Sequence, residues 1–154
     1  MTVRLLITDT AYALQQMQGA DWSDVAVLPG GSGALLPAAG PLDAARLEAA
    51  IEVAEDWLMP HARTLHGQVL EVHDATGRVH SGLDEVLSEQ GTRWSVAGFE
   101  TLFLRIVDLA TGPRVAASLA HRSSFVADVL VVRELAHHGA ADRVVLTRIE
   151  PKPL

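Results

Sequence analysis

A carboxylate, two imidazoles and a guanidinium flank a short turn near the middle of the chain. Glu71 and His73 precede residues 74–77, Asp-Ala-Thr-Gly, and Arg78 and His80 follow them. In an antiparallel hairpin, residues two apart share a face, so these four side chains would gather on one side of a sheet. The apolar neighbours would point into the core on the other side: Leu70, Val72 and Val79.

The hairpin gives our candidate catalytic group, which is Glu71, His73 and His80. Imidazoles titrate near neutral pH, so this group could shuttle protons or hold a divalent metal together with a carboxylate. His66 lies just before the hairpin and is a further binding candidate. The simpler interpretation, which we favour, is a polar sheet face that meets water.

A second cluster of chemistry-capable side chains lies in residues 133–138, Arg-Glu-Leu-Ala-His-His. On a helix, Glu134, His137 and His138 would lie close together, and Glu-x-x-His is a ligand spacing of metal-binding helical bundles. Such sites need further carboxylates from other helices, and the sequence has no second copy of the motif. We therefore favour a structural role, in which the histidines interact with the negative end of the helix dipole and pair with Glu134.

Several kinds of chemistry are excluded because the chain has no cysteine and no asparagine. Disulfides, thiolate metal ligands, a cysteine nucleophile and N-glycosylation are all absent. The segment Gly30-Gly31-Ser32-Gly33-Ala34 lacks the final glycine of a nucleophile elbow. The lysine of a P-loop and the glycine spacing of a dinucleotide site are also missing, so we interpret this segment as a flexible loop.

The charge of the chain argues against anionic partners. The net charge is −7, and residues 1–77 carry all of it, with ten acidic residues against three arginines. An acidic surface repels phosphate backbones and anionic lipids, so we expect neither nucleic acid nor membrane as a partner. The sequence has no apolar run of about 20 residues and no signal-peptide pattern, so we expect a cytoplasmic protein.

The hydrophobic periodicity indicates a mixture of strands and helices. Strands are expected at 3–8, 24–28, 115–120 and 143–149, helices at 41–58, 81–87, 99–110 and 123–138, and a hairpin at 68–80. Residues 9–17 fit either a helix or a loop, and residues 99–110 could equally form a buried strand. We predict a single α+β domain over residues 1–154, with a mixed or antiparallel sheet packed against about three to four helices. The alternative is an α/β fold.

No complete catalytic signature accompanies these elements. We therefore expect a small, acidic, soluble domain that serves as a noncatalytic binding or assembly module and forms a homo-oligomer, with a protein or small molecule as a further partner. The alternative is a small enzyme that uses His and Glu for acid–base chemistry or holds a divalent metal. The cofactor is unknown, and a metal is not favoured.

Overall fold

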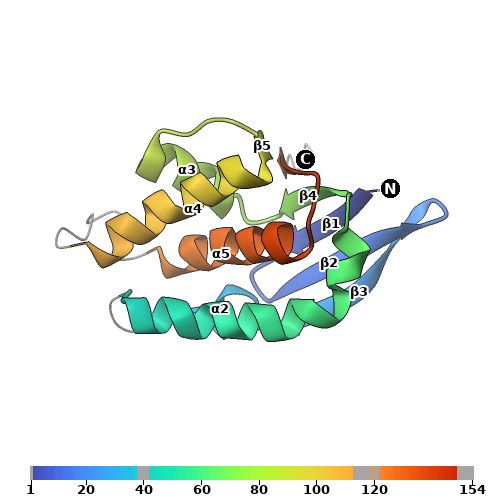
Figure 1. Ribbon diagram of the computed structural model, residues 1–154, viewed down its shortest axis with the longest axis horizontal. Coiled ribbons are helices and arrows are strands. Elements are labelled where there is room, and N and C mark those ends of the chain that lie inside the picture. Colours follow the sequence, from blue (N-terminus) through green and yellow to red (C-terminus); the bar gives the residue numbers. More distant parts are fainter. Residues whose placement is uncertain (1, 38–41, 113–118, 120–121, 149–154) are drawn as a thin grey trace, which may run out of the picture.

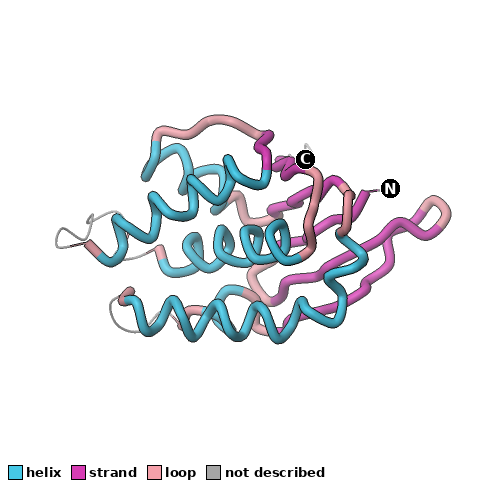
Figure 2. Tube along the Cα trace, in the orientation of Figure 1, coloured by secondary structure: helices cyan, strands magenta, loops and turns pink. Residues whose placement is uncertain are grey.

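The computed structural model describes residues 2–37, 42–112, 119 and 122–148, which form a mixed sheet and a layer of helices (Figures 1 and 2). The strands within these ranges are β1 Thr2–Ile7, β2 Ala11–Gln18, β3 Asp21–Pro29, β4 Val69–Asp74, β5 Arg93–Ser95 and β6 Arg143–Arg148. The α-helices are α1 Ser32–Leu35, α2 Ala44–Leu58, α3 Arg78–Leu87, α4 Val96–Thr111 and α5 Ser123–His138, and a 3-10 helix, η1, spans Met59–Leu65. The predicted α+β class is confirmed, with more helices than expected.

The strand order in the sheet is β3-β2-β1-β4-β6-β5. The first three strands form an antiparallel meander, whereas β1, β4 and β6 run parallel to one another and β5 is antiparallel to β6. Ile7, the last residue of β1, lies opposite Asp74, the last residue of β4. The carboxyl ends of the parallel strands therefore meet at one edge of the sheet, which we call the carboxyl edge.

The core is centred on α5, which lies between α2 and α4 (Figure 1). Residues 125–132 of this helix are all buried. Residues 129–132, Val-Leu-Val-Val, favour strands by intrinsic propensity, yet they form a helix because burial on every side outweighs that preference. The helix predicted at 123–138 is confirmed, with Arg122 at its N-cap.

The predicted hairpin at 68–80 is wrong. Strand β4 ends at Asp74, the chain turns at Gly77 with a φ of 75°, and α3 begins at Arg78. The carboxylate of Asp74 accepts hydrogen bonds from the backbone amides of Thr76, at 2.9 Å, and Val79, at 2.8 Å, which stabilises the start of a helix. Both edges of β4 already pair with β1 and β6, so no position remains for a returning strand.

Two other expectations need adjustment. Residues 9–17 are neither helix nor loop, because β2 begins at Ala11 and pairs with β1 and β3. Helix α2 begins at Ala44, where the carboxylate of the N-cap residue Asp43 accepts from the amide of Arg46 at 2.8 Å. The start predicted at residue 41 and most of the strand predicted at 115–120 lie outside the described residues. In the part of the chain that is described, no helix is long and apolar enough to cross a membrane.

Candidate functional site

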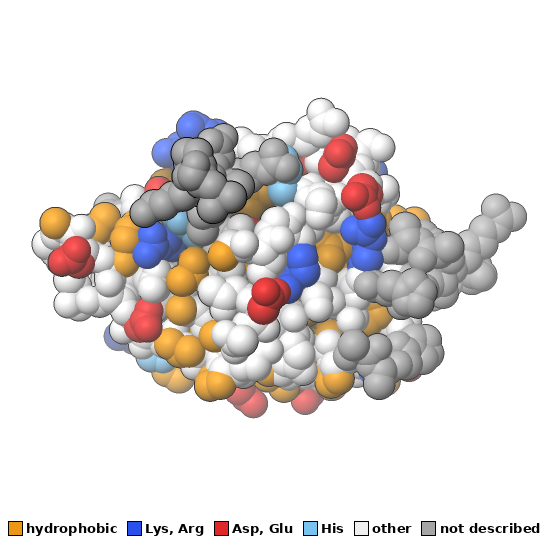
Figure 3. Space-filling model, turned by 180° about the vertical axis from the view of Figure 1, so that it is seen from behind, with side chains coloured by type: hydrophobic (Ala, Val, Ile, Leu, Met, Phe, Trp, Pro, Cys, Tyr) orange, Lys and Arg blue, Asp and Glu red, His pale blue; other side chains and the backbone are white. Residues whose placement is uncertain are grey.

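Two of the predicted catalytic residues, Glu71 and His73, lie together on the sheet face that is turned away from the core. Nε2 of His73 is 3.2 Å from Oε2 of Glu71, and both side chains are partly exposed. The alternate residues Leu70 and Val72 are buried, as predicted, and so is Val79. Figure 3, seen from behind, shows basic and acidic side chains next to one another among hydrophobic ones, with no single charged patch.

The third predicted catalytic residue, His80, is not part of this pair. It lies in α3 because the chain continues into a helix after Gly77 and does not return as a strand. His66 is exposed in the turn after η1, before the first residue of β4, whereas His73 lies near the carboxyl end of that strand. The structure therefore does not assemble the expected group of histidines around the hairpin face.

The second predicted cluster does form, but Glu55 takes the place of His137 in it. Nε2 of His138 is 3.0 Å from Oε2 of the fully buried Glu134. The same nitrogen is 3.0 Å from Oε1 of Glu55, which comes from α2. The ring of His137 packs edge-on against that of His138, with centroids 5.1 Å apart, but its Nδ1 lies 3.7 Å from Oε2 of Glu100 and does not join these atoms. Glu55 is 83 residues from His138, so no local pattern in the sequence could have indicated this contact.

A further polar group lies at the carboxyl edge and was not predicted as a unit. Nε of Arg78 donates to Oδ2 of the buried Asp128 at 2.9 Å, and Nη2 donates to Oδ1 at 3.2 Å. Nη1 of the same guanidinium donates to Oδ1 of Asp9 at 2.9 Å. The hydroxyl of Tyr12 donates to Oδ1 of Asp128 at 2.6 Å. Arg78 thus connects a buried carboxylate with one whose side chain is 84% exposed.

Burial governs the ionisation of this group. It raises the pKa of Asp128 to about 6, although hydrogen bonds from Arg78 and Tyr12 act in the opposite direction. Burial and the charge of Asp128 both raise the pKa of Tyr12, so its phenol stays protonated. Burial lowers the pKa of Arg78, but the hydrogen bonds and charge of Asp128 more than offset this effect and raise it overall. The guanidinium is therefore a permanent cation.

Three turns, residues 8–10, 30–31 and 75–77, meet near Arg78 and Asp9. The amide of Gly30, between β3 and α1, donates to the carbonyl of Thr10 at 2.8 Å, and the amide of Ala75 donates to the carbonyl of Ile7 at 3.0 Å. At Gly31, which has a φ of 54°, an added Cβ would lie 3.1 Å from the backbone nitrogen of Ala11. In open sheets, ligand sites commonly lie outside the carboxyl ends of parallel strands, which is the position of these turns.

One sequence signal could have indicated the buried acid. Asp128 falls on the apolar stripe of α5, between Phe125, Val129 and Val132, and an ionisable residue at such a position requires a partner in the core. Asp9 and Tyr12 could not be placed because the strand β2 was not recognised. Their contact with Arg78 and Asp128 depends on the pairing of β1 with β2 and β4.

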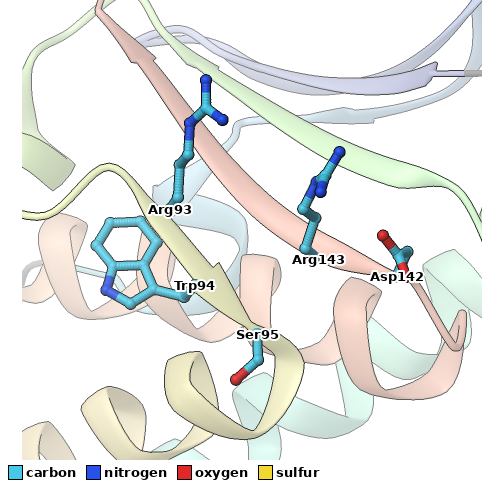
Figure 4. A pocket seen from close by; sticks show the side chains of 5 residues that line it. All are labelled: Arg93, Trp94, Ser95, Asp142 and Arg143. Carbon is cyan, nitrogen blue, oxygen red and sulfur yellow. The ribbon is translucent and has the colours of Figure 1, made fainter.

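A hollow of about 420 Å³ lies elsewhere, at the edge formed by β5 and β6. It is lined by Arg93, Trp94, Ser95, Asp142 and Arg143. Figure 4 shows the side chains of Arg93 and Arg143 extending in the same direction from neighbouring strands. Arg143 is the first residue of β6, so the hollow lies toward the end of the strand opposite the carboxyl edge. We regard it as a surface feature, because it is open and contains no buried polar group.

The fold is shared with a class of phosphatases of known structure. The type II variant of the Aquifex aeolicus Ppx/GppA phosphatase matches with a TM-score of 0.67 and 10% identity, over 96% of this chain and 53% of that chain. An exopolyphosphatase from Cytophaga hutchinsonii matches with a TM-score of 0.64 and 11% identity, over the same shares of the two chains. The chain thus spans about half the length of these structures. No protein-family model and no curated protein matches the sequence.

This likeness corrects part of the sequence-based description. From composition and the lack of a catalytic signature, we expected a homo-oligomeric protein-binding module. The solved structures that share the fold are instead phosphatase enzymes of the Ppx/GppA type. At this low identity the likeness establishes the fold, and any activity of this chain is a separate question that depends on its own side chains.

Proposed function

We propose that this chain is part of a hydrolase that cleaves phosphoanhydride or phosphate-ester bonds, with its site at the carboxyl edge. The observation that carries the proposal is the likeness of 96% of the chain to Ppx/GppA phosphatases. It favours the enzyme alternative over the noncatalytic module. The cluster of Arg78, Asp9 and the three surrounding turns supplies the local chemistry for such a site.

Arg78 is the residue that we assign to the substrate phosphate. Its Nε and Nη2 are held by Asp128, which fixes the plane of the guanidinium. Nη1 donates to the carboxylate of Asp9, which is exposed, so a phosphate oxygen could take its place. A phosphate oxygen would then accept from a preoriented, permanently charged donor, the arrangement that makes arginine suited to phosphate recognition.

Asp9 is the residue that we assign to a Mg²⁺ ion and the attacking water. The carboxylate of Asp74 already accepts from Thr76 and Val79, and that of Asp128 accepts from Arg78 and Tyr12. Mg²⁺ is commonly held by one or two carboxylates together with substrate phosphates and water, so Asp9 fits such a role. The ion would neutralise charge on the phosphate oxygens, which a single arginine does only in part.

Phosphate release and ligand binding together test the proposal. The wild-type chain should release orthophosphate from inorganic tripolyphosphate in the presence of MgCl₂, and Asp9→Asn should lower the rate roughly 100-fold or more. Without Mg²⁺, the same variant should bind tripolyphosphate more tightly, because the carboxylate that competes for Arg78 is gone. The matched control is Glu71→Gln, a partly exposed carboxylate of the open sheet face, which should change neither measurement.

The two measurements also separate hydrolysis from binding alone. Binding without phosphate release, with the variant tightening it, would retain the phosphate site and reject the hydrolase. The absence of both in calorimetry and phosphate assays would overturn the proposal as a whole. An equal effect of Asp9→Asn and Glu71→Gln would show that general surface charge, and not the carboxyl edge, governs the interaction.

A further inference from the structure

The far end of α5 holds a second polar cluster, which the proposed phosphatase chemistry does not use. In the described part of the chain, Glu55, Glu134 and His138 form the one group of three acidic or histidine side chains whose ligand atoms all lie within 4.8 Å of one another. Glu55 comes from the last turn of α2, and the other two residues come from the last turns of α5. The cluster thus joins the ends of two helices.

The imidazole of His138 cannot donate a hydrogen bond to both neighbouring carboxylates through one nitrogen. Nε2 of His138 lies 3.0 Å from a carboxylate oxygen of both Glu55 and Glu134. This nitrogen carries at most one hydrogen, and the hydrogen-bond geometry directs it to Glu55. Oε2 of Glu134 is buried and has no hydrogen-bond partner. A buried carboxylate oxygen without a donor is costly, so Oε2 of Glu134 can ligate a further cation, while Oε1 pairs with Arg133.

The spacing of the three atoms suits a bound metal. Zinc and similar ions lie roughly 2.0–2.2 Å from imidazole nitrogen and carboxylate oxygen, which sets neighbouring ligand atoms about 3 Å apart. Nε2 of His138 already has this separation from both carboxylates. Two oxygens and one imidazole nitrogen favour a first-row ion such as Zn²⁺ or Mn²⁺, since Ca²⁺ and Mg²⁺ prefer oxygen ligands alone.

A hydrogen-bond network behind the cluster orients the buried ligand. Nη1 of Arg133 donates to Oε1 of Glu134, and its Nη2 donates to Oε1 of Glu100 at 2.9 Å. Oε1 of Glu134 is therefore occupied, which leaves Oε2 to face His138. Partners of this kind fix first-sphere ligands and increase metal affinity. The side chains of Glu55 and His138 are 38% and 29% exposed, so an ion can enter and keep water in its open positions.

From these observations we propose that Glu55, Glu134 and His138 bind one divalent transition-metal ion that fastens α2 to α5. The site is distinct from the carboxyl edge, because His138 lies ten residues beyond Asp128 on the same helix, or about 15 Å along its axis. The ion stabilises the folded chain by binding it and not the unfolded chain. The inference stands or falls independently of the proposed phosphatase activity.

Calorimetry and thermal unfolding on the whole chain test the site. Protein made without an affinity tag and stripped with a chelator is titrated with ZnCl₂ and MnCl₂. The wild-type chain should bind one equivalent and unfold at a higher temperature with the ion present. Glu55→Gln and His138→Gln should each weaken binding at least about tenfold and abolish that shift. His137→Gln is the matched control, since His137 is the neighbouring histidine and lies against Glu100.

A second readout keeps the test decisive where a variant loses stability. Co²⁺ bound by carboxylates and imidazole has a visible absorption spectrum, which should appear on titration of the wild-type chain and His137→Gln and be lost in Glu55→Gln. Glu55 is partly exposed, so this variant is expected to fold. No stoichiometric binding by the wild-type chain, or equal losses in His137→Gln and His138→Gln, would overturn the proposal.

Discussion

The guanidinium of Arg78 donates two hydrogen bonds to the buried carboxylate of Asp128, at 2.9 Å and 3.2 Å. The two residues are 50 positions apart, and they join the first residue of α3 to the second turn of α5. Tyr12 adds a hydrogen bond from β2. The pair therefore ties two helices and the sheet together behind the carboxyl edge.

The loss of Arg78 and the loss of its exposed partner Asp9 should have unequal effects on the free energy of unfolding. Arg78→Gln leaves Asp128 buried without a counter-charge, so we expect the free energy of unfolding to fall by about 3 kcal/mol. Asp9→Asn removes only the exposed partner and should change it by less than about 1 kcal/mol. Urea unfolding at neutral pH measures both. Similar losses in the two variants would contradict the distinction between the buried and the exposed pair.

Asp128 should make stability depend on pH in the acidic range. Burial raises its pKa from 3.8 to about 6 in the folded chain, so the folded state holds the proton more tightly than the unfolded state. The resulting stabilisation is fully present below about pH 4 and is lost as the pH rises through about 6, and it is on the order of 3 kcal/mol. The check is the free energy of unfolding of the wild-type chain minus that of the non-titrating Asp128→Asn. This difference should decrease as the pH rises; an increase would mean that pairing with Arg78 outweighs burial.

The packing of α3 on α5 requires a glycine at position 82. An added Cβ would lie 2.3 Å from Cδ2 of Phe125, so Gly82→Ala must separate the two helices and should lower the free energy of unfolding by roughly 1–3 kcal/mol. Gly33→Ala in α1 is the control, because a Cβ there meets nothing within 4 Å and should be neutral or stabilising. Chemical denaturation compares the two. Equal stability would show that α3 is not packed closely at this point.

The pair of Glu71 and His73 should contribute little to folding. Both side chains are partly exposed on the open sheet face, and surface pairs of this kind contribute little. His73→Ala is therefore expected to change the free energy of unfolding by no more than about half a kcal/mol. The measurement is repeated with ZnCl₂, which should not alter the difference. A larger loss of stability in the presence of ZnCl₂ would indicate that Glu71 and His73 bind a metal on the sheet face.

The sequence by itself determined some of the helices and strands, namely those with a clear hydrophobic period. Leu47, Ala50, Ala54 and Leu58 recur at helical spacing and are buried in α2, and the alternation of Leu70 and Val72 with polar residues marks β4. The buried stripe of α5 was recognised in the same way, whereas the pattern of α4 fitted a buried strand as well as a helix. These patterns are local consequences of backbone geometry, since an amphipathic element must bury one face, and they are therefore readable without knowledge of the fold.

Only the tertiary structure decided the path of the chain after Asp74. A hairpin and a strand-to-helix turn both suit residues 74–77, because each accepts the positive φ of Gly77. Strand β4 has neighbours on both sides in β1 and β6, which excludes a returning strand and places Arg78 at the start of a helix.

The contacts of the candidate sites are likewise tertiary. Arg78 is 69 residues from Asp9 and 50 from Asp128, and Glu55 is 83 residues from His138. No local periodicity relates residues so far apart. The parallel pairing of β1 with β4 and the packing of α5 against its neighbours bring them within hydrogen-bonding distance, because burying the apolar faces of these elements fixes where their polar ends meet.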